Sequence, residues 1–254
     1  MTVHFVGAGP GAADLITLRA AALLAAAEVV LYPGTYLDAA VLGHCRDDAT
    51  LVDTQELDLD RITAVMVDAH AAGQEVVRLT SGDPSLYSAL HEQTRRLDAA
   101  GVPWDVTPGV PAYAAAAAVV GRELTVPLVA QSVVLTRTQA RSTAMPERES
   151  LTAYAATGAT LVLHLAITRT RELMAQLAPF YGDHCPVAVV HRASQPQEQV
   201  LRGTVGTIAD LVEDAGLRQA AVILVGPALA TSQPTDSESY LYSSIRVQRK
   251  ARLT

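Results

Sequence analysis

Lysine is almost absent from this sequence. Lys250, near the C-terminus, is the only lysine among 254 residues, and arginine supplies the rest of the basic charge. Schiff-base catalysis, attachment of pyridoxal phosphate and a P-loop for nucleotide phosphates each need a lysine at a defined position in the core of the fold. The sequence excludes these three classes of function, because no lysine stands where a core is expected.

Cysteine and long apolar runs are also scarce. Cys45 and Cys185 belong to no CxxC pair, so neither a zinc site nor a redox motif is expected. The longest apolar run, around Ala20–Ala27, is too short to cross a bilayer, and the N-terminal residues lack the basic and apolar regions of a signal peptide. We therefore expect a cytoplasmic protein without a metal site and without a membrane partner.

The overall composition is that of a folded, acidic protein. Half of the residues are hydrophobic and 18% are charged, whereas disordered chains are poor in apolar residues. At roughly 100–200 residues per domain, the length corresponds to one large domain or two modest ones. The formal net charge of −7 argues against a general nucleic-acid binder, since phosphate binding needs a basic surface.

Short β-rich runs alternate with alanine-rich helical patterns, which predicts an α/β fold with mostly parallel pairing in its first half. The character of the sequence changes after Pro127. We therefore expect two α/β domains, 1–128 and 129–230, and a tail, 231–254, rich in Ser, Thr and Gln. The predicted strands are Val3–Gly7, Val29–Tyr32, Glu75–Thr80, Val102–Thr107, Val129–Thr136, Thr160–Leu165, Val187–Val190, Gln199–Gly203 and Ala221–Val225. The predicted helices are Thr17–Ala27, Ile62–Ala72, Ser85–Ala100, Ala112–Val120, Thr168–Ala178 and Ile208–Ala215.

The turn Gly7-Ala8-Gly9-Pro10-Gly11 follows a predicted strand and precedes a predicted helix. This pattern is similar to the GxGxxG/A fingerprint of dinucleotide-binding proteins, with Ala12 in the last place. Pro10 removes an amide that could face a phosphate, and the second predicted strand ends without an acid for a ribose hydroxyl. An NAD-dependent oxidoreductase is therefore one interpretation of this turn, and a purely structural strand-to-helix turn is another.

Two more glycine-containing turns follow predicted strands. The stretch Ser81–Tyr87 contains Gly82, which permits close backbone approach, and Asp83, which could accept a hydrogen bond from a ligand or cap the next helix. Pro108-Gly109-Val110-Pro111-Ala112 follows the next strand. Because α/β proteins bind ligands at the carboxyl ends of parallel strands, the three turns together predict one ligand site along these ends.

Several stretches resemble the tetrapyrrole methylase family in their order and spacing, from about residue 3 to residue 230. They are GAGPGAADLIT, SGDPSLY, TPGVPAYAAAA, VLTRTQARSTAMPERESL and VVHRASQPQEQVLRGT, with VLHLA and AAVILVGPAL in the second half. The resemblance implies a two-domain, usually homodimeric methyltransferase with S-adenosylmethionine folded in the cleft between the domains. LYPGTYLDAAVL, the arginine-rich stretch after Val133, RASQPQEQVLRGT and the tail residues Leu241 and Tyr242 are most similar to members that methylate carbon C11 of a corrin precursor. Methylation of another ring carbon remains open.

The resemblance also implies which residues bind the cofactor. They are Pro10, Ser81, Gly82, Asp83, Leu86, Pro111, Ala112, Leu165, Ala193 and Ala221. Three of them depart from the family pattern: Ser81 stands where glycine is common, Pro111 where threonine is common and Leu165 where methionine is common. The proline removes a hydroxyl contact with the cofactor.

A tetrapyrrole substrate carries several acetate and propionate carboxylates, and an acidic protein needs a local cationic patch to bind them. Arginine suits this role because its guanidinium pairs with a carboxylate through two hydrogen bonds. The candidates are Arg137 and Arg141, followed by Arg19, although all three could be solvated surface residues. No Ser–His–Asp set or paired-carboxylate motif occurs, so no catalytic side chain is assigned. A non-catalytic protein that senses the cofactor is the remaining alternative.

Overall fold

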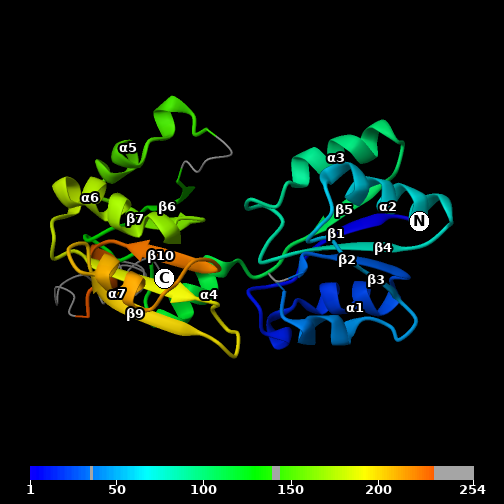
Figure 1. The fold of residues 1–254 in the computed structure, drawn as a ribbon, viewed down its shortest axis with the longest axis horizontal. Helices are drawn as coiled ribbons and strands as arrows, with labels where there is room; N and C mark the ends of the chain where they lie inside the picture. Colours follow the sequence, from blue (N-terminus) through cyan, green and yellow to red (C-terminus); the bar gives the residue numbers. More distant parts are fainter. Residues whose placement is uncertain (35–36, 139–143, 232–254) are drawn as a thin grey trace, which may run out of the picture. The chain divides into compact units, whose positions relative to one another are not determined.

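The computed structural model describes residues 1–34, 37–138 and 144–231. The chain folds into two compact α/β units, each built around a five-stranded sheet (Figure 1). Unit 1 consists of Met1–Ala115 together with Arg192–Glu198, and unit 2 consists of Ala116–His191 and the residues from Gln199 onward. The predicted α/β class is confirmed.

The two units divide at different residues from the predicted domains, 1–128 and 129–230. Helix α4 (Ala112–Val120) contains the division, and its second half belongs to unit 2 with the turn that follows it. Hydrogen bonds explain this assignment. The Val120 carbonyl accepts from Arg202 (3.1 Å), the Leu124 carbonyl from Thr160 Oγ1 (2.8 Å), and Arg122 Nε donates to the Leu229 carbonyl (3.4 Å).

Unit 1 contains a fully parallel sheet with the strand order β3-β2-β4-β1-β5. The five carboxyl ends, and the loops that follow them, therefore share one edge of the sheet. The sequence analysis does not predict β3, because this edge strand is largely exposed and presents no buried apolar run. The strands are β1 (Val3–Gly7), β2 (Val29–Tyr32), β3 (Thr50–Asp53), β4 (Val76–Thr80) and β5 (Trp104–Thr107).

Helices cover both faces of this sheet (Figure 1). Helix α1 (Leu18–Ala26) packs on one face, and helices α2 (Leu59–Ala71) and α3 (Leu90–Ala99) pack on the other. Successive strand residues point to opposite faces, so Val77 and Leu79 of β4 contribute to the core under α1, while Val76 faces α2 and α3. Both cores are therefore set by the period-2 pattern of the buried strands.

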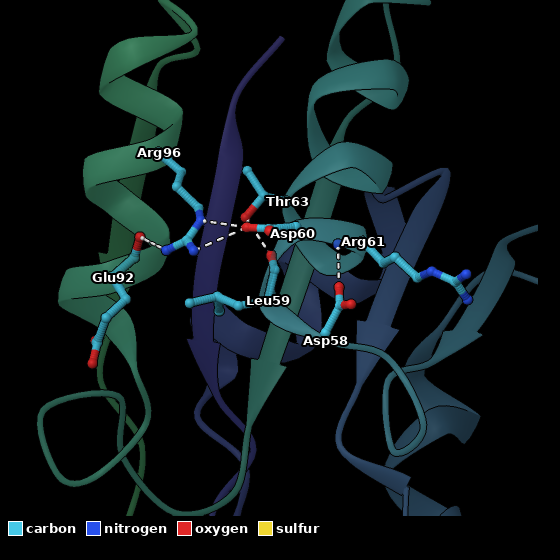
Figure 2. Close-up of polar contacts among 7 residues, drawn as sticks. All are labelled: Asp58, Leu59, Asp60, Arg61, Thr63, Glu92 and Arg96. Carbon is cyan, nitrogen blue, oxygen red and sulfur yellow. Dashed lines mark hydrogen bonds and ion pairs between the residues drawn. The ribbon is translucent and has the colours of Figure 1, made fainter.

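Polar contacts fix the position of α2 and join it to α3 (Figure 2). Asp58 caps α2 by accepting a hydrogen bond from the Arg61 amide (2.8 Å), so the helix begins at Leu59, earlier than predicted. Arg96 of α3 donates to Asp60 Oδ1 of α2 from both Nε (3.2 Å) and Nη2 (2.9 Å). This exposed pair orients the two helices but adds little stability.

The predicted helix Ser85–Ala100 is wrong in its first turn. Helix α3 begins only at Leu90, because Tyr87 (φ 54°) and Ala89 (φ 55°) adopt left-handed backbone conformations that a right-handed helix cannot include. The residues from Asp83 to Ala89, here called the β4–α3 loop, therefore form an irregular connection. This loop contains most of the SGDPSLY motif.

Unit 2 contains a mixed sheet with the order β6-β7-β10-β8-β9, in which only β6 and β7 run parallel. Helices α5 (Leu151–Ala155), α6 (Thr170–Tyr181) and α7 (Ile208–Asp214) contribute to one buried core on this sheet. The predicted strand Val129–Thr136 begins later, because Ala130 pairs with Val126 in a turn. The short helix α5 was not predicted. The strands are β6 (Val133–Arg137), β7 (Thr160–His164), β8 (Pro186–His191), β9 (Gln199–Thr204) and β10 (Ala221–Val225).

Both cysteines are free thiols, Cys45 half-buried and Cys185 buried. Burial raises the pKa of Cys185 to about 11, so its thiol stays protonated at neutral pH. Within the three described ranges, no cluster of three or more His, Cys, Asp or Glu side chains could bind a metal. No helix of that part of the chain is long and apolar enough to cross a membrane.

Candidate functional site

The three glycine-containing turns meet at the carboxyl edge of the unit 1 sheet. The amide of Gly9 donates to the Gly82 carbonyl (3.1 Å), and the amide of Gly82 donates back to the Gly9 carbonyl (2.8 Å). The amide of Gly109, in the third turn, donates to Asp83 Oδ2 (2.8 Å). The three turns therefore lie side by side, as a single ligand site along the strand ends would require.

The turns approach one another so closely that side chains are excluded. A Cβ atom on Gly109 would lie 2.2 Å from the Gly82 carbonyl oxygen, and one on Gly7 would lie 2.5 Å from the Gly109 amide nitrogen. Both neighbours are backbone atoms, which cannot move aside as a flexible side chain can. Glycine at positions 7 and 109 is therefore a condition for bringing the turns together.

Asp83 joins two of the turns and does not cap a helix, since α3 starts seven residues later. Its Oδ1 accepts hydrogen bonds from the Ser85 amide (2.8 Å) and the Ser85 hydroxyl, and its Oδ2 accepts from Gly109. Partial burial would raise the pKa of Asp83, but the hydrogen bonds from Ser85 and Gly109 outweigh it and lower the pKa. An ionised carboxylate accepts about four hydrogen bonds, so Oδ2 can accept one more from a ligand ammonium or hydroxyl group.

The first glycine turn is engaged within unit 1 and does not form a phosphate cradle. The Ala8 amide donates to the Thr80 carbonyl (2.8 Å), the Gly9 amide to Gly82, and the Ala12 amide to Ser194 Oγ (3.1 Å). Pro10 has no amide hydrogen. Three amides of this turn, those of Ala8, Gly9 and Ala12, therefore already donate to protein acceptors and are not available to a dinucleotide pyrophosphate.

The expectation that this turn opens a helix is also wrong. It leads into a short 3-10 turn, Ala13–Leu15, and α1 begins only at Leu18, after the capping residue Thr17. A dinucleotide fingerprint places the pyrophosphate at the N-terminus of the helix that the glycine turn opens. That geometry is missing at this turn, which argues against the NAD interpretation.

The segment Arg192–Glu198 covers the first turn, a role that the sequence analysis did not assign to it. Gln195 Nε2 donates to the Pro10 carbonyl (3.2 Å), and a Cβ atom on Gly11 would lie 2.2 Å from Gln195 Cγ. Ser194 binds Ala12 from the same segment. The RASQPQ stretch was noticed only as a family motif, because nothing in its composition indicates a contact with residues more than 180 positions away.

Unit 1 brings eight of the ten predicted cofactor residues to this edge or next to it. Ser81 is exposed, whereas Pro10 and Gly82 are buried. Leu86 is half-buried in the β4–α3 loop, where its amide donates to the Asp83 carbonyl (3.3 Å). The remaining members are Asp83, Pro111 and Ala112, which follow or begin neighbouring elements, and Ala193 beside Ser194.

The other two predicted cofactor residues lie together in unit 2. Leu163 of β7 pairs with Ile223 of β10 in the antiparallel ladder. Leu165 lies two residues after Leu163, just beyond the end of β7, and Ala221 lies two residues before Ile223, at the start of β10. Leu165 adopts a left-handed conformation (φ 53°), and 67% of its surface is exposed. These two residues therefore occupy the same end of the β7–β10 pair.

Arg137, a predicted substrate residue, ends β6 at that same edge of the unit 2 sheet. It is half-buried and lies opposite His164 in the parallel register of β6 and β7. Burial lowers the pKa of His164, which keeps its imidazole neutral near pH 7. Arg19 lies exposed in the first turn of α1, and Arg141 lies outside the described residues.

A cavity of about 400 Å³ between α6 and α7 is not part of this site. Arg171, which lines it, pairs with Asp210 (2.5 Å) and Glu213 (2.8 Å), and Arg169 pairs with Glu172. The charges around the cavity thus largely neutralise one another.

Residues 2–209 match the model of a protein family, the Tetrapyrrole (Corrin/Porphyrin) Methylases. The chain belongs to the tetrapyrrole methylase family. A precorrin-4 C(11)-methyltransferase from Rhodococcus erythropolis is 54% identical over 246 residues, which cover 97% of this chain and 98% of that protein. The family predicted from the sequence motifs is confirmed.

Two solved structures of tetrapyrrole methylases resemble this fold. The X-ray structure of a cobalamin biosynthetic enzyme, cobalt precorrin-4 methyltransferase (CbiF), superposes with a TM-score of 0.87 at 36% identity, over 90% of this chain and 96% of that chain. A uroporphyrin-III C-methyltransferase from Thermus thermophilus, complexed with S-adenosyl homocysteine, gives a TM-score of 0.76 at 28% identity, over 90% of this chain and 99% of that chain.

Proposed function

We propose that this tetrapyrrole methylase transfers a methyl group from S-adenosylmethionine to carbon C11 of precorrin-4 in cobalamin biosynthesis. The observation that carries the proposal is the 54% identity, over nearly the full length of both chains, to a precorrin-4 C(11)-methyltransferase. The likeness to the cobalt precorrin-4 methyltransferase structure supports the same substrate class. Both agree with the C11 subgroup that the sequence motifs favour.

The arrangement of unit 1 is compatible with S-adenosylmethionine as the methyl donor. Asp83 is ionised and can accept one more hydrogen bond, which suits the ammonium or ribose hydroxyl groups of the cofactor. Gly82 has φ 68°, a left-handed conformation that glycine adopts without strain, and Asp83 follows directly from this turn. The related Thermus thermophilus enzyme was solved with S-adenosyl homocysteine, the product of such a donor.

The methyl transfer depends on binding and orientation of the donor and the tetrapyrrole more than on an acid or a base. S-adenosylmethionine supplies an electrophilic sulfonium methyl group, and a reduced tetrapyrrole offers a ring carbon made nucleophilic by conjugation with a pyrrole nitrogen. Holding the two in line and excluding water accounts for most of the acceleration that such a transfer needs. Within this proposal, the turns of unit 1 orient the donor and no side chain is assigned a proton transfer.

Arginine is proposed to bind the carboxylates of the tetrapyrrole. Arg137 is the best placed candidate among the described residues, because it stands at the same edge of the unit 2 sheet as Leu165 and Ala221. Arg141 and Arg19 remain candidates from the sequence. A bidentate guanidinium–carboxylate pair would fix the orientation of the ring as well as its affinity.

Assembly as a homodimer in the cytoplasm is part of the same proposal and follows from family resemblance. Sedimentation velocity of the purified protein distinguishes a dimer from a monomer of 26.7 kDa. Fractionation of the producing cells locates the protein.

The rival functions make different predictions for ligand binding. An NAD-dependent oxidoreductase would be stabilised by NAD, whereas the proposed enzyme is stabilised by S-adenosylhomocysteine, and a thermal-shift comparison separates them. The occupied amides of the first glycine turn already argue against NAD. A protein that only senses the cofactor would bind S-adenosylhomocysteine but show no turnover.

The decisive experiment is incubation with methyl-labelled S-adenosylmethionine and a set of precorrin intermediates, each with and without cobalt. NMR then locates the label on the product. Label at C11 of precorrin-4 or its cobalt form supports the proposal. Label at another ring carbon would assign the chain to a sibling activity, and no transfer to any intermediate would favour the sensing function.

A further inference from the structure

Strand β4 contains a buried cation that has no acidic partner among the described residues. Arg78 is only 7% exposed, and it belongs to none of the ion pairs in that part of the chain. Its burial lowers its pKa to about 10, which still leaves the guanidinium charged at neutral pH. A buried charge of this kind costs stability, so packing alone does not explain it.

Neutral acceptors surround the guanidinium. Arg78 Nη1 donates to Thr54 Oγ1 (3.3 Å) and to the Leu79 carbonyl (3.0 Å), and Nε donates to Gln93 Oε1 (3.1 Å). Thr54 follows β3 and Gln93 lies in the first turn of α3. The side chain of Arg78 thus joins three elements at the edge of the sheet where the glycine turns meet.

Arg78 determines the orientation of the Gln93 amide. A guanidinium only donates hydrogen bonds, so the oxygen of Gln93 must face it and the NH₂ group must point away. That NH₂ group donates to the carbonyls of Ser88 (3.2 Å) and Ala89 (3.1 Å), and Gln93 is 1% exposed. The network therefore runs from the central strand of the sheet to the end of the β4–α3 loop.

The β4–α3 loop needs such an anchor, because its backbone is unfavourable. Tyr87 and Ala89 both have left-handed conformations, and neither is glycine. Residues in this region persist only where their surroundings hold them. The bonds from Gln93 reach the carbonyl of Ala89 and that of Ser88, which lies between the two left-handed residues. Asp83 and Ser85 hold the other end of the loop.

We propose that Arg78 and Gln93 are positioning residues for the methyl donor: the guanidinium orients the Gln93 amide, which fixes the Ser88 and Ala89 carbonyls and so sets the shape of the β4–α3 loop. The inference rests on the proposed function, since it assumes that this loop binds the cofactor. Neither residue needs to touch the ligand. Their effect reaches it through the backbone of the loop.

Two substitutions separate loop positioning from general stability. Gln93→Glu keeps an oxygen acceptor for Arg78, but it removes both N–H donors to the loop. Gln93→Met has nearly the same length and removes the acceptor as well. Thr63→Val is the matched control, since Thr63 is a buried polar residue of unit 1 whose hydroxyl donates to the Leu59 carbonyl (2.8 Å), away from the loop (Figure 2).

Calorimetry measures S-adenosylhomocysteine affinity, thermal unfolding measures stability, and amide hydrogen exchange reports on the β4–α3 loop. We expect Gln93→Glu to weaken binding about tenfold and to speed exchange in the loop, with little change in melting temperature. Gln93→Met should show the same two effects and a lower melting temperature, because it leaves Arg78 without its acceptor. Thr63→Val should lower the melting temperature and leave affinity and loop exchange at wild-type values.

The inference is overturned if, in the Gln93→Glu variant, the loop amides exchange at wild-type rates and S-adenosylhomocysteine binds with wild-type affinity. It is also overturned if Thr63→Val loses as much affinity as the Gln93 variants, since the effect would then follow stability. Failure of the wild type to bind S-adenosylhomocysteine would reject the proposed function instead. The exchange rates would still decide whether Gln93 holds the loop.

Discussion

At the scale of single residues, Asp83 has a structural role and is proposed to bind the cofactor as well. Its carboxylate ties the β4–α3 loop to the turn of Gly109, and one acceptor position remains for a ligand. From the sequence alone, a helix cap and a ligand partner are alternative roles for Asp83. The contact with Gly109 is long-range, so the sequence pattern around Asp83 could not reveal it.

Replacing Asp83 is therefore expected to change stability and binding together. Asp83→Ala leaves the Gly109 and Ser85 amides without their acceptor, which should cost about 1–3 kcal/mol of unfolding free energy. S-adenosylhomocysteine affinity should fall about ten- to a hundredfold in calorimetry. Ser85→Ala, which removes only the hydroxyl bond, serves as the control and should have a smaller effect on both. Unchanged affinity in Asp83→Ala would reject the assignment of Asp83 to the cofactor.

His164 makes the stability of unit 2 depend on pH. Burial lowers the pKa of His164 in the folded protein, so the unfolded chain binds more protons at mildly acidic pH. The contribution of the neutral, buried His164 to the stability of unit 2 is complete above the ordinary imidazole pKa of about 6.5. This contribution is lost as the pH falls below that value. Chemical denaturation at several pH values should give a shallower decline for His164→Gln than for the wild type. His184→Gln, at an exposed position, is the control, and an equal change in slope would contradict the assignment.

At the scale of elements, the site depends on three turns that pack backbone against backbone. Gly109→Ala places a Cβ atom 2.2 Å from the Gly82 carbonyl oxygen, so the turns must separate. We expect a marked loss of S-adenosylhomocysteine affinity and a lower melting temperature. Gly43→Ala is the control, because a Cβ atom there meets no other atom within 4 Å. A Gly109→Ala protein with wild-type affinity and stability would show that the turns tolerate separation.

The elements that the sequence predicted well are those with a strong local signal. The buried strands Val3–Gly7, Val29–Tyr32 and Ala221–Val225, and the helix Ala112–Val120, have the predicted bounds. Failures occur where distant contacts override the local pattern. Residues 85–89 look helical, but they form a loop with left-handed residues. Gln93 and Asp83 bond to this loop, and they are themselves held by the more distant Arg78 and Gly109.

At the scale of the whole chain, family motifs indicated the candidate site in more detail than composition did. They suggested ten candidate cofactor residues, of which eight lie in unit 1 and two lie at one edge of the unit 2 sheet. They missed Ser194, Gln195, Arg78 and Gln93, whose roles depend on contacts between segments far apart in sequence. A motif therefore suggests a candidate binding loop, and the structure identifies the contacts that hold that loop.

The net negative charge of the chain predicts that substrate binding depends on arginine. The chain carries a formal charge of −7, so it repels a polycarboxylate unless cations are gathered locally. Arg137→Gln and Arg141→Gln keep much of the size and some hydrogen bonding but remove the charge. Each should raise the apparent KM for the tetrapyrrole and leave the affinity for S-adenosylhomocysteine unchanged.

The dependence of KM on ionic strength distinguishes a direct contact between Arg137 and a substrate carboxylate from an indirect effect of the substitution. If Arg137 meets a carboxylate of the substrate, the difference in KM between the variant and the wild type should shrink at high ionic strength, because screening already weakens exposed ion pairs. Arg61→Gln removes the same charge from an exposed position on α2 and should change neither constant. Equal effects on both ligands, or none on either, would return Arg137 and Arg141 to the solvated surface. The carboxylate-binding residues would then be sought at Arg19 and among the other arginines of unit 2.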